Sequence, residues 1–288
     1  MIVLRILHIS DVHFGPPHLK DLSQEVLKLE EDRRPDLVVV SGDLTQRAKP
    51  HQFQQARRFV DQFKAPALVV PGNHDVPLYR FWERFLAPYG AYRKHFDADL
   101  EPVIQTPPGF LAVGINTAHG WTFTEGRIRS RRLQEVADLL ESVPKSAPKI
   151  VVAHHNLVPP PRFGRQKVVW NASKAIDLFS RAGVDLILSG HNHQAFVAES
   201  ESFYPSGRLP VVILHSGTTT SDRGRGSEEG GNSCFWIEID ALTVMISLLR
   251  REPDLGRFAE YSRHSYPRRE RDPYTLEDAV PPEPEGRG

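Results

Sequence analysis

The chain has 288 residues, one cysteine, and 36 basic residues that are balanced by 36 acidic ones. A chain of this length can bury a sizeable core as one large α/β domain or as two smaller ones. The balanced charge provides no overall field that would draw the protein to nucleic acid or to an anionic membrane, which weakens a nuclease interpretation without excluding it. Because Cys234 is the only cysteine, an internal disulfide and a thiolate metal site are both excluded.

Short apolar runs rich in Val, Ile and Leu recur along the first two thirds of the chain. Gly, Pro or polar residues bound these runs, as is typical of strands buried on both faces. The segments between them have helical spacing, and this alternation predicts a parallel sheet with right-handed crossovers. Ser130 and Asn171 are expected to be N-caps, and Gly183 is expected to end a helix. The predicted strands are Val3–Ile9, Leu37–Val40, Ala67–Val70, Leu111–Ile115, Ile150–Ala153 and Val184–Leu188, and the predicted helices are Leu19–Arg33, His51–Phe63, Ser130–Val143 and Asn171–Ala182.

After residue 193 the pattern changes to strands without helices between them, which predicts an antiparallel sheet packed on the parallel part. These strands are His193–Ala198, Leu209–His215, Cys234–Ile239 and Val244–Leu249, with a hairpin turn at Ile239–Leu242. The Gly-rich, charged segment Ser216–Asn232 is interpreted as a mobile surface loop or a lid. We therefore expect one domain over residues 1–250 and a polar C-terminal extension over 251–288 that is weakly ordered at its end.

The first ten residues are apolar but contain Arg5 and His8 and lead directly into Asp11. This stretch is too short to span a bilayer and has no basic region before its apolar core and no small-residue cleavage site. A cytoplasmic location is therefore the expectation.

Five of the predicted strands end in residue types that bind metal ions. The five segments are Asp11-Val12-His13, Gly42-Asp43, Gly72-Asn73-His74-Asp75, His154-His155 and Gly190-His191-Asn192-His193. Strand ends that lie side by side in a sheet can gather such residues around one pocket. Oxygen and imidazole donors without thiolate suit two hard or borderline divalent cations. Asp43 can bridge the two cations with its two oxygens, and two cations about 3.5–4 Å apart can clamp a phosphate and activate a water.

The order D-x-H, G-D, G-N-H-[DE], H and G-H-x-H resembles the calcineurin-like metallophosphoesterases. The resemblance implies a four-layer α/β/β/α sandwich with two packed mixed β-sheets and the metals at the carboxyl ends of the strands. It also implies Mn²⁺ or Fe as the ions, with Zn²⁺ as a further option. One metal would take Asp11, His13, Asp43 and His193, and the other would take Asp43, Asn73, His154 and His191.

Within that family, Gly42–Thr45 and Gly72–Asp75 resemble the class III cyclic nucleotide phosphodiesterase and glycerophosphodiesterase branch. The Ser/Thr protein phosphatases would have G-D-x-x-D-R-G and G-N-H-E, which Gln46, Arg47 and Asp75 do not match. His74 is predicted to be catalytic because an imidazole beside the metals can stabilise the phosphoryl oxygens or protonate the leaving alkoxide. Asp75 is predicted to hydrogen-bond that ring and keep it protonated.

Other polar and aromatic residues near these segments allow two interpretations. His155 is either a phosphate contact or a structural histidine, and Asn116 is either a substrate contact or the end of a strand. Arg162 and Arg165 are either phosphate contacts or solvated charges. The cluster Tyr79, Phe81, Trp82 and Phe85 favours core or helix packing over a nucleobase platform. His119 and His215 are interpreted as surface or loop residues that follow strands and could line the pocket.

The leading hypothesis is a hydrolase that uses two metal ions and a metal-bridging hydroxide to attack a small phosphodiester in line, for example a 3′,5′-cyclic nucleotide. The alternatives are a DNA nuclease similar to the SbcD group, a lipid-precursor pyrophosphatase, or a non-catalytic scaffold on the same fold. The expected partner is a small phosphodiester, with nucleic acid less favoured and no membrane. The sequence leaves the oligomeric state open.

Overall fold

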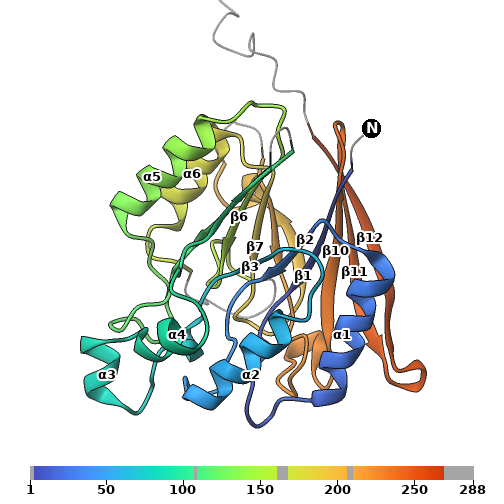
Figure 1. The fold of residues 1–288 in the computed structure, drawn as a ribbon. Coiled ribbons are helices and arrows are strands. Elements are labelled where there is room, and N and C mark those ends of the chain that lie inside the picture. The colour runs from blue at the N-terminus through green and yellow to red at the C-terminus, as the bar shows by residue number, and fades with distance from the viewer. Residues whose placement is uncertain (1–2, 107–108, 161–167, 206–209, 269–288) are drawn as a thin grey trace, which may run out of the picture.

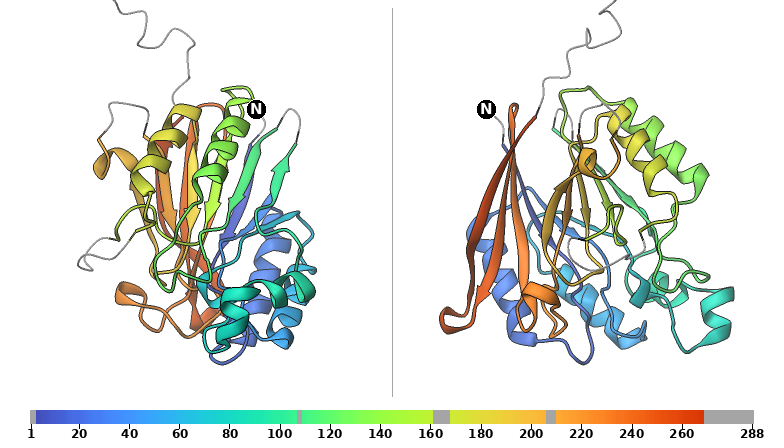
Figure 2. Two further views of the ribbon diagram at one scale, coloured as in Figure 1. Left: turned by 90° about the vertical axis from the view of Figure 1, so that its left-hand side faces the viewer. Right: turned by 180° about the vertical axis from the view of Figure 1, so that it is seen from behind.

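The computed structural model describes residues 3–106, 109–160, 168–205 and 210–268. Two six-stranded mixed sheets pack face to face, and helices cover the outer face of each (Figure 1). The chain therefore forms the four-layer α/β/β/α sandwich that the sequence predicts, and the two further views show the same layers (Figure 2). Arg162 and Arg165 lie outside the described residues.

The first sheet has the strand order β12-β11-β10-β1-β2-β3. β1, β2 and β3 are parallel, whereas β10, β11 and β12 continue the sheet in antiparallel pairs. Helices α1 and α2 pack on its outer face through Val26, Phe53 and Phe59. The bounds are β1 Leu4–Ile9, α1 Lys20–Arg33, β2 Leu37–Val40, α2 Pro50–Val60, β3 Ala67–Val69, β10 Ser233–Ile239, β11 Thr243–Glu252 and β12 Arg257–Pro267.

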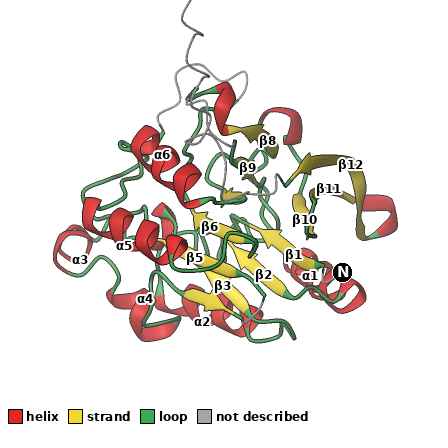
Figure 3. Cartoon of the chain, turned by 90° about the horizontal axis from the view of Figure 1, so that it is seen from above, coloured by secondary structure: helices red, strands yellow, loops and turns green. Residues whose placement is uncertain are grey.

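The second sheet has the strand order β4-β5-β6-β7-β9-β8, with β5, β6, β7 and β9 parallel. Helices α5 and α6 cover its outer face through Val136, Leu140 and Phe179. Seen from above, the helices lie around the outside of the strands (Figure 3). The bounds are β4 Val103–Gln105, β5 Leu111–Ile115, α5 Ser130–Glu141, β6 Lys149–Ala153, α6 Ala172–Ala182, β7 Leu186–Ser189, β8 Phe196–Glu199 and β9 Val212–His215.

Strand residues alternate between an inner and an outer core, because successive side chains of a strand point to opposite faces. In β2, Leu37 and Val39 pack between the two sheets, whereas Val38 and Val40 pack against the outer helices. The parallel strands of both sheets end at the same edge of the sandwich. The short helices α3 (Phe81–Leu86) and α4 (Gly90–His95) lie at this edge (Figure 1).

Several local predictions need correction. The antiparallel strands do not form a separate sheet but extend the two parallel ones. Each strand therefore pairs with a neighbour on both sides, except the strand at each end of a sheet. Ser130 is the first residue of α5, and Arg129 holds the N-cap position. Asn171 does hold the N-cap of α6, but its amide bonds both the N–H and the C=O of Ile128 instead of the helix. Gly183 ends α6 in the left-handed conformation, φ 76°, as predicted.

Of the core or helix packing expected for the 79–85 aromatic cluster, the structure shows the second: the rings of Phe81 and Phe85 in α3 lie 5.3 Å apart between centroids. Tyr79, Phe81 and Trp82 are 75%, 64% and 82% exposed. The C-terminal residues 257–267, which look polar in sequence, form the edge strand β12. The domain boundary at residue 250 stays a prediction. In the described part of the chain no helix is long and apolar enough to cross a membrane, and the cellular location also stays a prediction.

Candidate metal centre

The ends of five strands bring the seven predicted metal ligands to one place. Both sheets contribute, since β1, β2 and β3 belong to the first sheet and β6 and β7 to the second. Backbone hydrogen bonds tie neighbouring loops together: Asp11 N donates to the Gly42 carbonyl and Gly190 N to the His154 carbonyl, each at 3.1 Å. The loops that follow these strands therefore hold the side chains over a shared pocket.

The first cluster combines two carboxylates with two imidazoles, all of them buried. One oxygen of Asp11, Oδ1, is fully buried and has no hydrogen-bond partner in the described part of the chain. A buried oxygen without a donor, facing two imidazole nitrogens, is what a site for a cation requires. His193 Nε2 lies 3.1 Å from Asp11 Oδ1 and 3.2 Å from His13 Nε2, and His13 Nε2 lies 3.7 Å from Asp11 Oδ1 and from Asp43 Oδ2.

The second cluster is built around the amide oxygen of Asn73. This oxygen lies 3.1 Å from His154 Nε2 and 2.9 Å from His191 Nδ1. His155 lies beside these rings, with its Nδ1 2.8 Å from the Thr117 hydroxyl. This cluster therefore offers an amide oxygen and imidazole nitrogens, where the first cluster offers carboxylates and imidazoles.

Asp43 lies between the two clusters. Its Oδ2 faces His13 Nε2 at 3.7 Å, and its Oδ1 faces His154 Nε2 at 3.3 Å. The same Oδ1 accepts a hydrogen bond from the His74 backbone N–H at 2.8 Å, which fixes the carboxylate plane. The geometry suits a carboxylate that bridges two cations, one on each side.

Contacts behind the imidazoles fix their orientation. His154 Nδ1–H donates to the Ser41 carbonyl and His193 Nδ1–H to the Arg223 carbonyl, both at 2.8 Å. These bonds set the tautomer and leave Nε2 facing the site, as is usual behind metal-bound histidines.

The charges at the site also favour cations. Burial lowers the pKa of His13 to about 4 and that of His191 to about 3, so both imidazoles are neutral at pH 7 and have a lone pair to offer a cation. Burial would raise the pKa of Asp11, but the facing imidazoles of His193 and His13 hold it well below its usual range. Burial would also lower the pKa of His154, yet Asp43 raises it to about 9, which shows how strongly the carboxylates attract positive charge here.

The backbone at the site is strained. Seven non-glycine residues have positive φ in the described part of the chain, and five of them are predicted ligands: Asp11, His13, Asp43, His191 and His193. Such conformations cost about 1–3 kcal/mol each and persist only where the surroundings impose them. Their concentration at the strand ends indicates that the fold trades stability for the placement of these side chains.

Two glycines next to the ligands leave room for them. A Cβ on Gly72 would collide with Asp43, and a Cβ on Gly190 would collide with Ser10 and Asp11. We expect Gly72→Ala and Gly190→Ala each to weaken metal binding at least about tenfold, because each would displace a carboxylate that is predicted to be a ligand. Gly90→Ala is the matched control, since its nearest neighbour would be 3.7 Å away. Metal affinities measured by competition with a chelator test this, and equal affinities in all three variants would contradict it.

His74 lies in a 3₁₀ turn that begins at Asn73, with its ring edge-on to that of His13 at 4.9 Å between centroids. The hydrogen bond expected between its ring and Asp75 is not formed. His74 Nδ1–H donates instead to the Gln46 carbonyl at 3.0 Å. The ring is therefore held beside the metal site by the loop after β2.

Asp75 points away from His74 and into the protein. Its Oδ1 accepts from the Thr45 N–H and hydroxyl, and its Oδ2 accepts from the Leu44 and Gly72 N–H groups, at 2.8–3.0 Å. Asp75 thus fastens the loop of Asp43 to the loop of Asn73. The Asp75 carboxylate does not bond the His74 ring because its two oxygens already accept four hydrogen bonds from these loops.

Sequence reasoning missed two contributors, Gln46 and Arg223. Arg223 Nη1 donates to Gln46 Oε1 at 2.8 Å, and the Gln46 carbonyl holds His74. The loop that contains Arg223 begins with the wholly buried residues 216–221, whose backbone and hydroxyls bond to the segment around Asp11. The first part of this loop is therefore a support of the site rather than a mobile surface segment. No local pattern signals these contacts.

His215 is buried at the end of β9 rather than on the surface. It stacks on Phe196, and its Nδ1 lies 2.8 Å from Asn156 Oδ1. Burial lowers its pKa to about 3 from an ordinary 6.5. As the pH falls below about 6.5, His215 takes up a proton in the unfolded chain but stays neutral in the folded one. Protonation therefore favours the unfolded chain, and the free energy of unfolding decreases as the pH falls.

We therefore expect His215→Asn to reduce the acid sensitivity of folding. At pH 7 the variant should be less stable than the wild type. At pH 5 the difference between their free energies of unfolding should be smaller by about 2 kcal/mol, which is the linkage free energy for 1.5 pH units below 6.5. Urea unfolding at both pH values measures this. A gap of the same size at pH 7 and pH 5 would refute the assignment of a neutral buried His215.

Residues 4–195 match the calcineurin-like phosphoesterase family. The chain is 29% identical over 172 residues to a probable cyclic nucleotide phosphodiesterase of Synechococcus, covering 58% of this chain and 61% of the relative. It is 37% identical over 82 residues to the glycerophosphodiester phosphodiesterase GpdQ of Enterobacter lignolyticus, covering 24% and 29%. The chain thus spans less than two thirds of either relative.

Solved structures show the same fold. A purple acid phosphatase from yellow lupin superposes with a TM-score of 0.68 at 12% identity, covering 92% of this chain and 53% of that one. A dimetal phosphatase from Danio rerio superposes with a TM-score of 0.65 at 10% identity, covering 91% and 98%. The chain belongs to the calcineurin-like phosphoesterase family. Together with the His/Asp cluster, this membership indicates a site for two divalent metal ions.

Proposed function

We propose that the protein is a dinuclear metal-dependent phosphodiesterase that hydrolyses a small phosphodiester, such as a 3′,5′-cyclic nucleotide. The observation that carries the proposal is the position of Asp43, whose two oxygens face two separate donor clusters. The names of the two curated relatives, a probable cyclic nucleotide phosphodiesterase and a glycerophosphodiester phosphodiesterase, support a diester substrate.

The ligands that we propose for one ion are Asp11, His13, Asp43 and His193, and those for the other are Asp43, Asn73, His154 and His191. Mn²⁺ or Fe is the proposed metal, with Zn²⁺ as the alternative, because the donors are oxygen and imidazole without thiolate. When bound, two such ions supply the charge that clamps a phosphate and lowers the pKa of a water toward neutrality.

The protein's own groups supply position and a proton. The Gln46 carbonyl fixes His74 through Nδ1, and in the described part of the chain the ring has no second hydrogen-bond partner. In its imidazolium form the ring has a proton on both nitrogens, so His74 Nε2 can then donate a hydrogen bond to a phosphoryl oxygen or its proton to the leaving alkoxide. Asp75 acts as a positioning residue, because it joins the loops of Asp43 and Asn73 without reaching the substrate side. Arg223, held by Gln46 and half-buried, is a candidate contact for the phosphate charge.

A substrate screen tests the proposal. Protein reconstituted with Mn²⁺, Fe²⁺ or Zn²⁺ is assayed against bis(p-nitrophenyl) phosphate, cyclic nucleotides, glycerophosphodiesters, p-nitrophenyl phosphate and linear DNA. We expect turnover of small diesters with at least one metal and little turnover of monoesters. Hydrolysis of monoesters alone would overturn the diester assignment, and DNA cleavage at rates matching small diesters would favour the nuclease alternative.

A further inference from the structure

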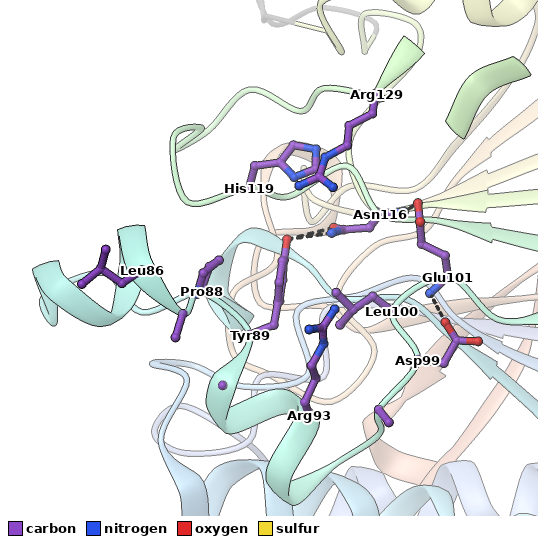
Figure 4. A pocket seen from close by; sticks show the side chains of 13 residues that line it. Leu86, Pro88, Tyr89, Arg93, Asp99, Leu100, Glu101, Asn116, His119 and Arg129 are labelled. Carbon is purple, nitrogen blue, oxygen red and sulfur yellow. Dashed lines mark hydrogen bonds between the residues drawn. The ribbon is translucent and has the colours of Figure 1, made fainter. Parts of the chain in front are cut away.

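A cavity of about 500 Å³ lies beside α4, apart from the candidate metal centre. Its walls come from α4 and the residues around it, from the 98–101 segment, and from the stretch that follows β5 (Figure 4). None of the nine predicted catalytic and metal-binding residues lines it. The segment 116–118 divides the two sites: Asn116 lines the cavity, whereas Thr117 contacts His155 on the metal side at 2.8 Å.

Two guanidinium groups, those of Arg93 and Arg129, line the cavity. Neither has an ion-pair partner among the residues that the structure describes. The nearby carboxylates are already engaged, since Asp99 Oδ1 accepts from the Glu101 N–H at 2.9 Å and Glu101 Oε1 accepts from the Asn116 N–H at 3.0 Å. Glu101 Oε2 also lies 3.4 Å from Arg132 Nε. Glu101 is thus paired with Arg132, whereas Asp99 keeps its charge, so the lining groups without an ion-pair partner in the described part of the chain are Arg93, Arg129 and Asp99, with a net charge of +1.

The back wall is polar and held in place. Tyr89 is only 8% exposed, and its hydroxyl receives a hydrogen bond from Asn116 Nδ2 at 2.8 Å. Asn116 Oδ1 in turn accepts from the Ala118 N–H at 3.0 Å. His119 Nε2–H donates to the Arg127 carbonyl at 2.8 Å, which leaves Nδ1 as an acceptor for a ligand hydroxyl or amine. These polar groups are already held in one position, so they lose little conformational entropy when a ligand binds. They therefore favour a ligand whose polar groups match their positions.

The remaining lining is apolar: Pro88 and Leu100 lie on either side of the tyrosine, and Leu86 lies further out on α3 (Figure 4). A cavity of this volume, with an apolar wall and a few placed polar groups, has the make-up of a small-molecule site. Two guanidiniums favour a phosphate over a carboxylate, since a phosphate brings up to two charges and three acceptor oxygens.

We propose that this cavity is a second ligand site that binds a small organic phosphate. The phosphate lies between Arg93 and Arg129, and the organic part lies against Leu86, Pro88 and Tyr89. This site is independent of the reaction at the metal centre, so its test does not depend on which diester the protein hydrolyses.

Equilibrium dialysis of the metal-loaded protein against radiolabelled adenosine 5′-monophosphate tests the site. The double variant Arg93→Gln, Arg129→Gln is expected to bind one molecule fewer per chain than the wild type. Arg131→Gln is the matched control, because the Arg131 side chain is 92% exposed and forms an ion pair with Glu135 along its own helix. This control should bind as many molecules as the wild type. Equal stoichiometry in the double variant and the wild type would overturn the proposal.

Two further measurements keep the result unambiguous. Unchanged circular dichroism and unchanged hydrolysis of the best substrate from the screen show that the double variant is folded and that its metal centre is intact. Inorganic phosphate should compete for the second site at least tenfold more weakly than adenosine 5′-monophosphate, because it makes no contact with the apolar wall. Equal competition by the two would overturn the assignment of an organic phosphate.

Discussion

Asp43→Ala is expected to lower kcat/KM for a small diester by at least about 10³-fold and to reduce the bound metal from two ions to one or none. Both donor clusters lose a carboxylate oxygen in this variant, because Oδ1 faces His154 and Oδ2 faces His13. Metal ions contribute several kcal/mol to the stabilisation of transition-state charge, which corresponds to a factor of this size. Metal content per chain and hydrolysis of bis(p-nitrophenyl) phosphate measure the two effects.

The matched control for this substitution is Asp61→Ala, which removes a half-exposed carboxylate that pairs with Arg57 at the end of α2. The control should keep two ions and full activity, because a surface ion pair of this kind contributes little to stability. An Asp43→Ala variant that still binds two ions would show that the carboxylate does not bridge them.

His74→Ala is expected to lower kcat by about 10²–10³-fold while both ions remain bound, since His74 touches the pocket but belongs to neither donor cluster. The size of the loss depends on the leaving group. A p-nitrophenolate leaves without protonation, whereas an alkoxide needs a proton, so the loss should be larger for an alkyl diester if His74 is the general acid. Steady-state rates on aryl and alkyl diesters separate protonation of the leaving group from stabilisation of the phosphoryl oxygens.

His51→Ala serves as the control for this variant, because His51 is exposed on α2. Its kinetics should match those of the wild type. Activity of His74→Ala equal to that of the wild type on every substrate would remove His74 from the mechanism.

The sequence predicts the sandwich well because its strands are buried on both faces. Runs such as Leu37–Val40 and Leu111–Ile115 are apolar at every position and can be recognised without knowledge of their neighbours. The site follows from the same feature, since each predicted ligand comes directly after such a run. The carboxyl ends of parallel strands meet at the same edge of a sheet. The local patterns and this one rule are therefore enough to predict that the seven side chains lie close together.

The features that could not be predicted depend on contacts between distant segments. β12 is polar and largely exposed, and its backbone pairing with β11 rather than its composition makes it a strand. Asp75 looks like a partner for His74 because it follows that residue. Its true partners, the N–H groups of Leu44 and Thr45, come from the loop after β2. Arg223 reaches Gln46 across 177 positions of sequence, a contact that no spacing rule indicates.

The most direct test of the account is a crystal structure of the Mn²⁺-loaded protein with anomalous diffraction data collected at the manganese edge. Two anomalous peaks about 3.5–4 Å apart are expected, with one oxygen of Asp43 coordinated to each ion. A single peak, or two peaks of which only one contacts Asp43, would contradict this expectation.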